Sequence, residues 1–314
     1  SALSNLRQVR VALVEMGSTS FRLTIETERE THHRIHHLNL GSSVSANGSF
    51  TESDIDGATG VLSEFMSVAK VHNCQRIVAV ATESFRLAAN GHAVATHIAR
   101  EAGCEVKVLS PDEENNLVWQ AMVNQFHAVD NLVAVAITGG SVGIAAGPIS
   151  SRVPLHSFSY PLGGSVLAPR ASADGFVDTS TRVRLEHHIA ESLKPAGAVV
   201  RNIVMPQFVV SGGMPLALAK LIHTVRRSEV PEVLDGLTID CSDLGHLIKT
   251  FDELSLPARL ALPGISSKRA PNMALGAIIL RQVLRSLDVH AVEVSNAGLR
   301  EGLLGRIYAD AKAA

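Results

Sequence analysis

A strand that runs into a glycine- and serine-rich turn and returns as a second strand is predicted twice, and this repeat constrains the fold more than any other feature. The first copy covers residues 9–26 with its turn at 17–20, and the second covers residues 132–147 with its turn at 139–141. The arms are short apolar runs bounded by turn residues, which is typical of strands. The repeat therefore predicts two similar α/β domains.

The residues between and after the two copies predict further strands and helices. Strands are expected at 31–40, 76–81, 104–109, 158–161 and 207–210, and helices at 55–71, 92–102, 112–124 and through a tail at 214–314 that prolines interrupt. A chain of 314 residues is long enough for two domains with separate cores. Turn residues near 125–130 set the boundary, so the domains are predicted at 1–127 and 128–297.

Composition argues against several classes of protein. The formal net charge is −2, so no broad basic field is expected and nucleic-acid binding is not predicted. No apolar run approaches the ~20 residues that a transmembrane helix needs, so no membrane partner is predicted. Cys74, Cys104 and Cys241 are far apart and lack metal-ligand spacing. Such thiols are typical of a reducing compartment, and a cytoplasmic protein is predicted. A homodimer is left open.

Three glycine-rich turns follow predicted strands and are candidate phosphate-binding loops. Backbone N–H groups in such turns can surround phosphate oxygens, and a helix that starts nearby favours negative charge. The alternative interpretation is an ordinary tight turn. The candidate phosphate-binding residues are Gly17, Ser18, Thr19, Ser20, Thr138, Gly139, Gly140, Ser141, Ser211, Gly212 and Gly213.

Two arginines and two glutamates are the candidate catalytic side chains. Arg22 and Arg86 each lie just past a turn, and a guanidinium binds phosphate oxygens bidentately, although either arginine could face solvent instead. Glu113 and Glu114 are paired carboxylates of the kind that serve as general bases. Their alternative role is the acidic first turn of a helix, which the helix dipole favours.

A run of four histidines and one arginine at residues 32–37 suggests a metal site at first sight. Alternate residues of a strand point to opposite faces, so the run splits into two groups that cannot share one ion. We therefore predict the solvated face of an early hairpin here.

Five segments follow one another along the chain: residues 11–23 around the first turn, Ala81-Thr-Glu-Ser-Phe-Arg86, Ser110-Pro-Asp-Glu-Glu-Asn-Asn-Leu117, Val135-Ala-Ile-Thr-Gly-Gly-Ser141 and Val209-Val-Ser-Gly-Gly213. This ordered set resembles the exopolyphosphatase and guanosine pentaphosphate phosphohydrolase (Ppx/GppA) family. Residues 262–270 and 298–304 also look like family segments, so the resemblance spans nearly the whole chain.

The resemblance implies the fold shared by actin, sugar kinases and the heat-shock chaperone ATPases. This is an α/β fold of two actin-like (ASKHA, RNase H-like) domains with an interdomain cleft. It also implies that the last helix, at about residues 298–314, returns to the first domain.

The resemblance also implies roles for individual residues. Glu114 would orient or deprotonate the attacking water, and Arg22 and Arg86 would contact the phosphate chain. Glu15 occupies the position of an aspartate that holds a divalent cation in the family. Ala136 replaces a second such aspartate, so we expect Mg²⁺ to be held weakly and to arrive with the substrate.

Other positions depart from the family pattern and count against full activity. Gly143 stands where the family has a glutamate, and Asn116 stands where it has an arginine. Pro271 and Asn296 stand where aspartates are expected near the C-terminal helices.

The resemblance thus predicts a phosphohydrolase that cleaves a phosphoanhydride or phosphoester of polyphosphate, pppGpp or a related nucleotide by water attack in the interdomain cleft. Its partner would be a small phosphorylated substrate. Two alternatives stay open. One is a catalytically impaired phosphate- or nucleotide-binding protein, and the other is a phosphatase whose substrate is a specialised small metabolite.

Overall fold

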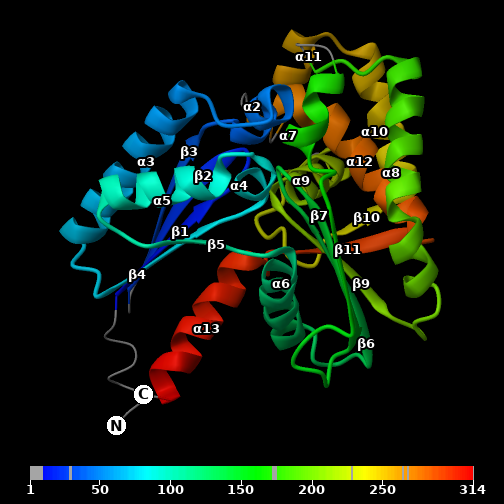
Figure 1. Cartoon of the computed structure of the whole chain (residues 1–314). Coiled ribbons are helices and arrows are strands. Elements are labelled where there is room, and N and C mark those ends of the chain that lie inside the picture. Colours follow the sequence, from blue (N-terminus) through cyan, green and yellow to red (C-terminus); the bar gives the residue numbers. More distant parts are fainter. Residues whose placement is uncertain are drawn as a thin grey trace. The chain divides into compact units, whose positions relative to one another are not determined.

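The structure is a computed structural model that describes residues 10–27, 30–171, 175–227, 229–263, 265–266 and 269–313. The chain forms two compact α/β units, each with its own mixed sheet (Figure 1). Unit 1 comprises Ser1–Glu114 and Arg300–Ala314, and unit 2 comprises Asn115–Leu299. The predicted α/β class with two domains is confirmed. The division falls inside a helix and not at residues 125–130, because the later turns of that helix pack on the sheet of unit 2.

The sheet of unit 1 has five strands in the order β3-β2-β1-β4-β5. The strands are β1 (Val11–Met16), β2 (Ser20–Glu26), β3 (Thr31–His37), β4 (Arg76–Ala81) and β5 (Val106–Val108). β1, β2 and β3 are antiparallel neighbours, whereas β4 runs parallel to β1 and β5 runs parallel to β4. The carboxyl ends of β1, β4 and β5 therefore meet at one edge of the sheet, where ligands bind in open α/β sheets.

Helices cover one face of this sheet and complete the main core of unit 1. Ala12 and Val14 of β1 belong to one buried cluster with Phe65. The helices on this side are α2 (Leu40–Asn47), α3 (Glu52–Val71), α4 (Glu83–Leu87) and α5 (Gly91–Ala102). A capping box starts α3: Asp54 N–H donates to Thr51 Oγ1, and Thr51 N–H donates to the Asp54 carboxylate.

The opposite face of the same sheet carries the last helix, α13 (Leu299–Ala313), drawn in red in Figure 1. The Tyr308 hydroxyl donates to Glu26 Oε2 at 2.8 Å. Arg76 Nη1 donates to Ile307 O at 3.3 Å. These bonds tie α13 to β2 and β4.

The sheet of unit 2 has six strands in the order β10-β11-β9-β6-β7-β8. The strands are β6 (Asn131–Ile137), β7 (Val142–Pro148), β8 (His156–Tyr160), β9 (Gln207–Ser211), β10 (Thr238–Asp240) and β11 (Ala291–Ser295). β6, β7 and β8 are antiparallel neighbours, and β9 and β11 continue parallel to β6. Read from β8 to β11, the order and directions repeat those of β3 to β5, and β10 is an added edge strand.

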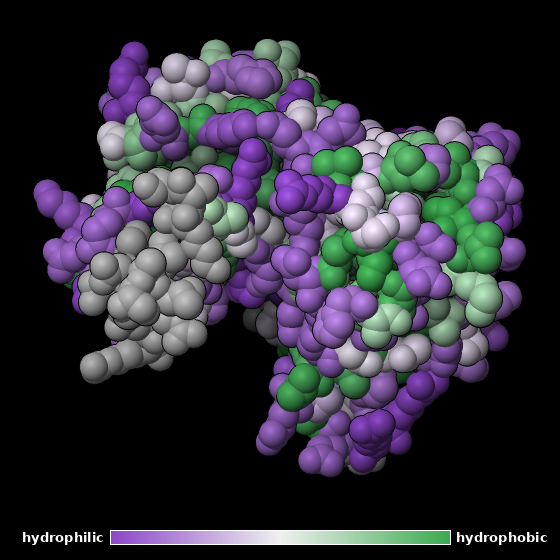
Figure 2. Space-filling view, turned by 90° about the horizontal axis from the view of Figure 1, so that it is seen from below, coloured by the Kyte–Doolittle hydropathy of each residue, from purple (hydrophilic) through white to green (hydrophobic). Residues whose placement is uncertain are grey.

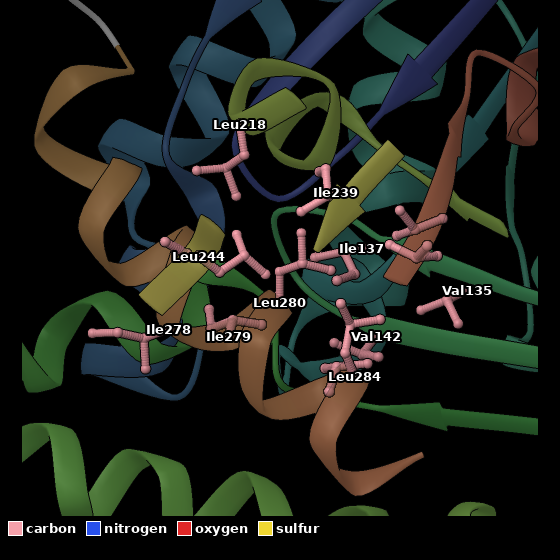
Figure 3. Close-up of a cluster of buried hydrophobic side chains, with 14 of the residues drawn as sticks. Val135, Ile137, Val142, Leu218, Ile239, Leu244, Ile278, Ile279, Leu280 and Leu284 are labelled. Atoms are coloured by element: carbon pink, nitrogen blue, oxygen red, sulfur yellow. The ribbon is translucent and has the colours of Figure 1, made fainter. Parts of the chain in front are cut away.

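Four long helices cover one face of this second sheet. They are α8 (Thr179–Val200), α9 (Gly213–Arg227), α10 (Cys241–Glu253) and α12 (Met273–Ser286), and the short elements of unit 2 are α7 (Gly164–Leu167), η1 (Ala168–Arg170), α11 (Leu256–Leu260) and η2 (Ala270–Asn272). Figure 3 shows Ile137 and Val142 of the sheet among Leu280 and Leu284 of α12 and Leu244 of α10, all of them buried. This cluster is the core that holds the second glycine-rich turn in place.

The other face of the second sheet is covered by α6 (Pro111–Gln125). Trp119 and Met122 of α6 share a buried cluster with Ala134 of β6. The indole Nε1 of Trp119 donates to Ser151 O at 3.1 Å. Because helices cover both faces, β6 is a nearly continuous apolar run and not an alternating one.

The prediction of a helical tail from residue 214 to 314 is wrong in two places, where β10 and β11 form. Val292 and Val294 of β11 are buried and Glu293 is less so, as in a strand. A run of five residues between helices cannot be assigned from periodicity alone, and pairing with β9 decides its state. Of the family-like segment 262–270, residues 264, 267 and 268 lie outside the described residues.

The histidine run forms β3, an edge strand in which none of the seven residues is buried. Arg34 Nη1 and His36 Nε2 both contact Glu64 Oε1, at 3.1 and 3.3 Å. The predicted solvated hairpin face is confirmed, and these charged side chains protect an exposed sheet edge against pairing with another strand.

Exposed apolar side chains include Leu155 and Met205, which are 68% and 92% exposed. On the face seen in Figure 2, apolar areas are interrupted by hydrophilic ones. In the part of the chain that the structure describes, no helix has the length and apolar character needed to cross a membrane.

Candidate active site

The turn between β1 and β2 is held by hydrogen bonds to its carbonyl groups. The Gly17 N–H donates to Ser20 O at 3.1 Å, and Ser18 O accepts from the Gly41 N–H at 2.7 Å. Thr19 O accepts two more N–H groups, at 3.0 and 3.1 Å, from the residues just before α2. With its carbonyl groups engaged by the protein, the turn is fixed in shape before any ligand binds.

Ser18 has a buried hydroxyl oxygen with no hydrogen-bond partner among the described residues. The hydroxyl oxygen of Ser84 on α4 is also buried and has no hydrogen-bond partner among the described residues. Leaving a buried hydroxyl unpaired costs about 1–3 kcal/mol, so such atoms call for an explanation. The contact of Ser18 with phosphate stays a prediction, because its hydroxyl oxygen is buried.

Glu15 and Arg22 are direct register partners across β1 and β2, so their side chains lie on the same face of the sheet. Burial raises the pKa of Glu15, and the positive charges of Arg22 and Arg300 act in the opposite direction. Arg300 belongs to α13, which lies on this face. Glu15 is therefore a desolvated carboxylate with cations as its neighbours.

These neighbours bear on the predicted metal role of Glu15. No group of three or more His, Cys, Asp or Glu side chains that could hold a metal ion occurs among the described residues. Mg²⁺ relies on one or two carboxylates together with waters and substrate phosphates. Because Glu15 faces Arg22 and no such group of three forms among the described residues, the residues do not fit a dedicated Mg²⁺ site. Weak binding together with substrate stays a prediction.

Arg86 lies on α4, just past the carboxyl end of β4, and its guanidinium is engaged by protein groups on three sides. Its Nε and Nη2 donate to Glu83 Oε2, Nη2 also donates to Glu114 Oε2 at 2.8 Å, and Nη1 donates to Leu109 O at 2.7 Å. The side chain is 13% exposed. These bonds use four of the five guanidinium N–H groups and leave one for a ligand. The contact of Arg86 with phosphate therefore stays a prediction.

Glu83 is a site residue that the sequence reasoning did not select. It is the first residue of α4, three before Arg86, and its side chain is 8% exposed. A carboxylate three residues before an arginine on a helix is a known pairing pattern, and this spacing is the signal that could have identified it.

Glu114 is the better buried of the two predicted glutamates, with a side chain 9% exposed. Burial raises its pKa, the charge and hydrogen bond of Arg86 lower it, and the charge of Glu83 raises it. Within the described part of the chain, its hydrogen bond is on Oε2 alone, and Oε1 is left for another partner. A carboxylate with a raised pKa and one unused oxygen has the properties of a general base.

Glu113 has a different role from its neighbour. Its carboxylate pairs with Lys107 and accepts from the Ser110 N–H at 2.9 Å, while its own N–H donates to Ser110 Oγ at 3.2 Å. The hydrogen bond from Lys107 holds the pKa of Glu113 below its ordinary value. Glu113 thus caps α6 and stays ionised, as the helix-start interpretation predicts.

The turn between β6 and β7 is closed by its own side chains. The Ser141 N–H donates to Thr138 Oγ1 at 3.0 Å, and the Thr138 N–H donates to Ser141 O at 2.9 Å. Gly139 O accepts from both the N–H and the hydroxyl of Ser165, at 2.8 and 2.6 Å. Like the first turn, this one is fixed through its carbonyl groups.

The third candidate loop lies beside the second because β9 is the parallel neighbour of β6. Ser211 pairs in register with Ala136 at the ends of these strands. Gly212 has φ +127°, and a Cβ there would overlap Ile137 O, so only glycine fits. Gly213 then starts α9.

Gly143 makes room for Asn115. The Asn115 amide donates to Ser157 Oγ at 3.1 Å and to Phe158 O at 2.7 Å. A Cβ on Gly143 would overlap Asn115 Oδ1. A glutamate of the kind the resemblance expects at 143 therefore does not fit while Asn115 holds this position, and Ala136, opposite Gly143 in β6, adds no ligand.

The structure brings the predicted residues together in two groups, one in each unit. The group in unit 1, at the carboxyl ends of β1, β4 and β5 and the start of α6, contains the predicted residues Glu15, Gly17, Ser18, Thr19, Ser20, Arg22, Arg86 and Glu114, and Glu83 lies with them. The group in unit 2, at the carboxyl ends of β6 and β9, contains Thr138, Gly139, Gly140, Ser141, Ser211, Gly212 and Gly213. The location of a site in an interdomain cleft stays a prediction from the resemblance.

Two units with one strand order, each with a glycine-rich turn after its first strand, define a two-domain actin-like α/β protein. The chain belongs to the Ppx/GppA phosphatase family, whose sequence profile matches residues 27–310. The family resemblance seen in the ordered segments is thus confirmed.

Individual relatives agree with this membership. Exopolyphosphatase 1 of Mycobacterium tuberculosis is 24% identical over 306 residues, covering 95% of this chain and 88% of that protein. Exopolyphosphatase 1 of Mycobacterium leprae is 26% identical over 271 residues, covering 86% and 79%. An exopolyphosphatase structure from Cytophaga hutchinsonii matches with a TM-score of 0.82 at 23% identity, covering 96% of this chain and 98% of that one. The Aquifex aeolicus Ppx/GppA family member matches with a TM-score of 0.75 at 23% identity and the same coverage.

Proposed function

We propose that this protein hydrolyses a phosphoanhydride or phosphoester bond of inorganic polyphosphate, of pppGpp or of a related nucleotide. The relatives named as exopolyphosphatases and the membership in the Ppx/GppA phosphatase family support this substrate class. The turns at residues 17–20 and 139–141, with the loop at 211–213, bind phosphate oxygens through their N–H groups.

The observation that carries the proposal is the state of Glu114. Its carboxylate is desolvated, which raises its pKa, and one oxygen is fixed by Arg86 while the other has no partner among the described residues. A base must be both held in place and able to accept a proton, and this arrangement meets both needs.

In the proposed reaction, Glu114 accepts a proton from a water molecule as the water oxygen bonds to phosphorus. The bond between phosphorus and its bridging oxygen breaks, and the leaving phosphate or nucleotide keeps the bonding electrons. Arg22, which lies on the same sheet face as Glu15, neutralises part of the phosphate charge.

The test is phosphate release from polyphosphates of several lengths and from nucleotides, with and without Mg²⁺, by wild type and by Glu114→Gln. We expect release by wild type and loss of most of it in the variant. Release that is equal in the two proteins would remove Glu114 from the reaction, and absence of release by wild type from every substrate would reject hydrolysis.

The alternative of a phosphate- or nucleotide-binding protein without turnover is favoured by one observation. Asn115 occupies the space in which a glutamate at position 143 would lie, and Ala136 carries no ligand group. Tight binding of a nucleotide or short polyphosphate, measured by calorimetry, without phosphate release would establish this alternative. A substrate panel that finds turnover of another phosphorylated metabolite would instead establish a retuned phosphatase.

A further inference from the structure

We propose, resting on the function proposed above, that Glu83 is a positioning residue for the base Glu114 and that it acts through Arg86. Glu83 holds one side of the guanidinium so that an Nη2 N–H group is aimed at Glu114 Oε2. This fixes one oxygen of the base and leaves the other, Oε1, for water.

The geometry of the three side chains supports this chain of action. Glu83 Oε2 accepts from both Nε and Nη2 of Arg86, and Nη2 donates its other N–H to Glu114 Oε2 at 2.8 Å. Leu109 O accepts from Nη1 at 2.7 Å and closes the remaining side. With this many contacts the guanidinium has one orientation, and so has the N–H group that reaches the base.

Burial makes the arrangement rigid and electrostatically strong. The side chains of Glu83, Arg86 and Glu114 are 8%, 13% and 9% exposed. Ion pairs that are removed from water are screened far less than surface pairs, so each charge acts strongly on the other two. Removing one member of such a group leaves the charge of another buried and unpaired, which destabilises the folded protein.

The charges of the group also decide how Glu114 behaves as a base. One guanidinium faces two carboxylates. The negative charge of Glu83 therefore offsets part of the positive charge of Arg86, which by itself lowers the pKa of Glu114. In agreement, the charge of Glu83 raises the pKa of Glu114, although burial is the larger cause and Arg86 opposes both. A base with a higher pKa accepts a proton more readily.

Other charged groups near Glu114 come from different elements and do not take over this role. Glu15 of β1 interacts electrostatically with Glu114, and Glu15 in turn is close to Arg22 of β2 and to Arg300 and Glu301 of α13. Among the described residues, Arg86 is the only cation that hydrogen-bonds to Glu114.

The experiment compares wild type, Glu83→Gln, Glu83→Asp and the control Glu113→Gln, all as the full chain. The carboxyl carbon of Glu114 is titrated by ¹³C NMR in ligand-free protein, with Glu114→Gln identifying its signal. The pH profile of kcat/KM for phosphate release is then measured on the same proteins.

Glu83→Gln should move both the NMR titration of Glu114 and the acid limb of the profile to lower pH. The sign follows because loss of the negative charge lowers the pKa of the base, and the base is active when deprotonated. Its kcat should fall on the order of 10- to 100-fold, as expected for a misplaced catalytic group. Glu83→Asp keeps the charge, so its limb should stay near that of wild type while kcat falls less.

Glu113→Gln removes a neighbouring ion-paired carboxylate outside this group, and it should move neither the titration nor the limb. If Glu83→Gln leaves the pKa from the NMR titration of Glu114 unchanged, the positioning role is overturned. If Glu83→Gln fails to fold, as circular dichroism would show, Glu83→Asp carries the test, and an unchanged kcat in that variant overturns the proposal. If wild type releases no phosphate, the proposed function fails, and the NMR titration still decides the role of Glu83.

Discussion

The two glycine-rich turns follow the first strands of two sheets with the same strand order, yet they are flanked by different residue pairs. Glu15 and Arg22 face each other across β1 and β2, whereas Ala136 and Gly143 face each other across β6 and β7. Beside the first turn the hydroxyl of Ser18 is unpaired among the described residues, while the polar side chains of the second turn bond to each other.

Under the proposed function, one backbone arrangement serves two purposes. Both turns present main-chain groups that are fixed by bonds to their carbonyls. In unit 1 the same sheet edge also carries the ionisable group of Glu83, Arg86 and Glu114, and the proposed function places proton transfer there. Unit 2 would then contribute phosphate binding through backbone N–H groups.

The largest expected effect tests this assignment directly. Glu114→Gln in unit 1 should lower the rate of hydrolysis on the order of 10²–10⁴-fold while sparing binding, because glutamine cannot accept a proton from water. The measurement is single-turnover phosphate release, with Glu113→Gln as the matched control on the same helix turn. Equal rates for wild type and Glu114→Gln would contradict the placement of proton transfer in unit 1.

A second variant tests whether the cation of unit 1 binds phosphate. Arg22→Ala should weaken binding of a short polyphosphate by about 1.5–3 kcal/mol, the range for a hydrogen bond to a charged group. Arg34→Ala is the control, because Arg34 pairs with Glu64 on the exposed edge strand and such pairs contribute little. Calorimetry that finds the same affinity for both variants would contradict the role of Arg22.

A third set of variants tests how tightly Gly143 packs against Asn115 beside the second turn. Gly143→Ala should destabilise the protein by about 1–3 kcal/mol, because the added Cβ overlaps Asn115 Oδ1 in a well-packed site. In an Asn115→Ala background the same substitution should cost less, since the overlapping atom is gone. Urea unfolding of the two single variants and the double variant measures this coupling, and strictly additive costs would show that the two positions are independent.

The smallest expected effect concerns metal binding. Ligand-free protein should bind Mg²⁺ weakly, because Glu15 faces Arg22 and no group of three or more candidate metal ligands forms among the described residues. Calorimetry should detect Mg²⁺ binding only after a non-hydrolysable triphosphate is added. Tight binding to the ligand-free protein would show that unit 1 holds a metal site of its own.

Much of the local structure could be predicted from the sequence because its signals are local. The strand predicted at 76–81 is β4, and the helix predicted at 55–71 lies within α3. Apolar periodicity and capping chemistry act within a few residues, so they can be read along the chain. β11 was missed because five residues carry too short a pattern, and its state depends on the neighbouring strand β9.

The candidate site shows the same division between local and distant information. The glycine-rich turns and the glutamate pair could be selected from residue types and order. The sequence could not show that Arg86 is engaged by Glu114 and Leu109, because these groups come from other segments than α4.

The sequence by itself determined the repeated strand–turn–strand pattern, the order of the family segments and the presence of Ala136 and Gly143 where the resemblance predicts acidic residues. Only the tertiary structure decided the partner of each charge and the space around each glycine. Gly143 is explained by Asn115, which is 28 residues away in the chain and reaches the same sheet through α6. Side-chain pairing and steric room depend on which strand ends and helix faces meet in the fold, and a linear pattern does not contain that information.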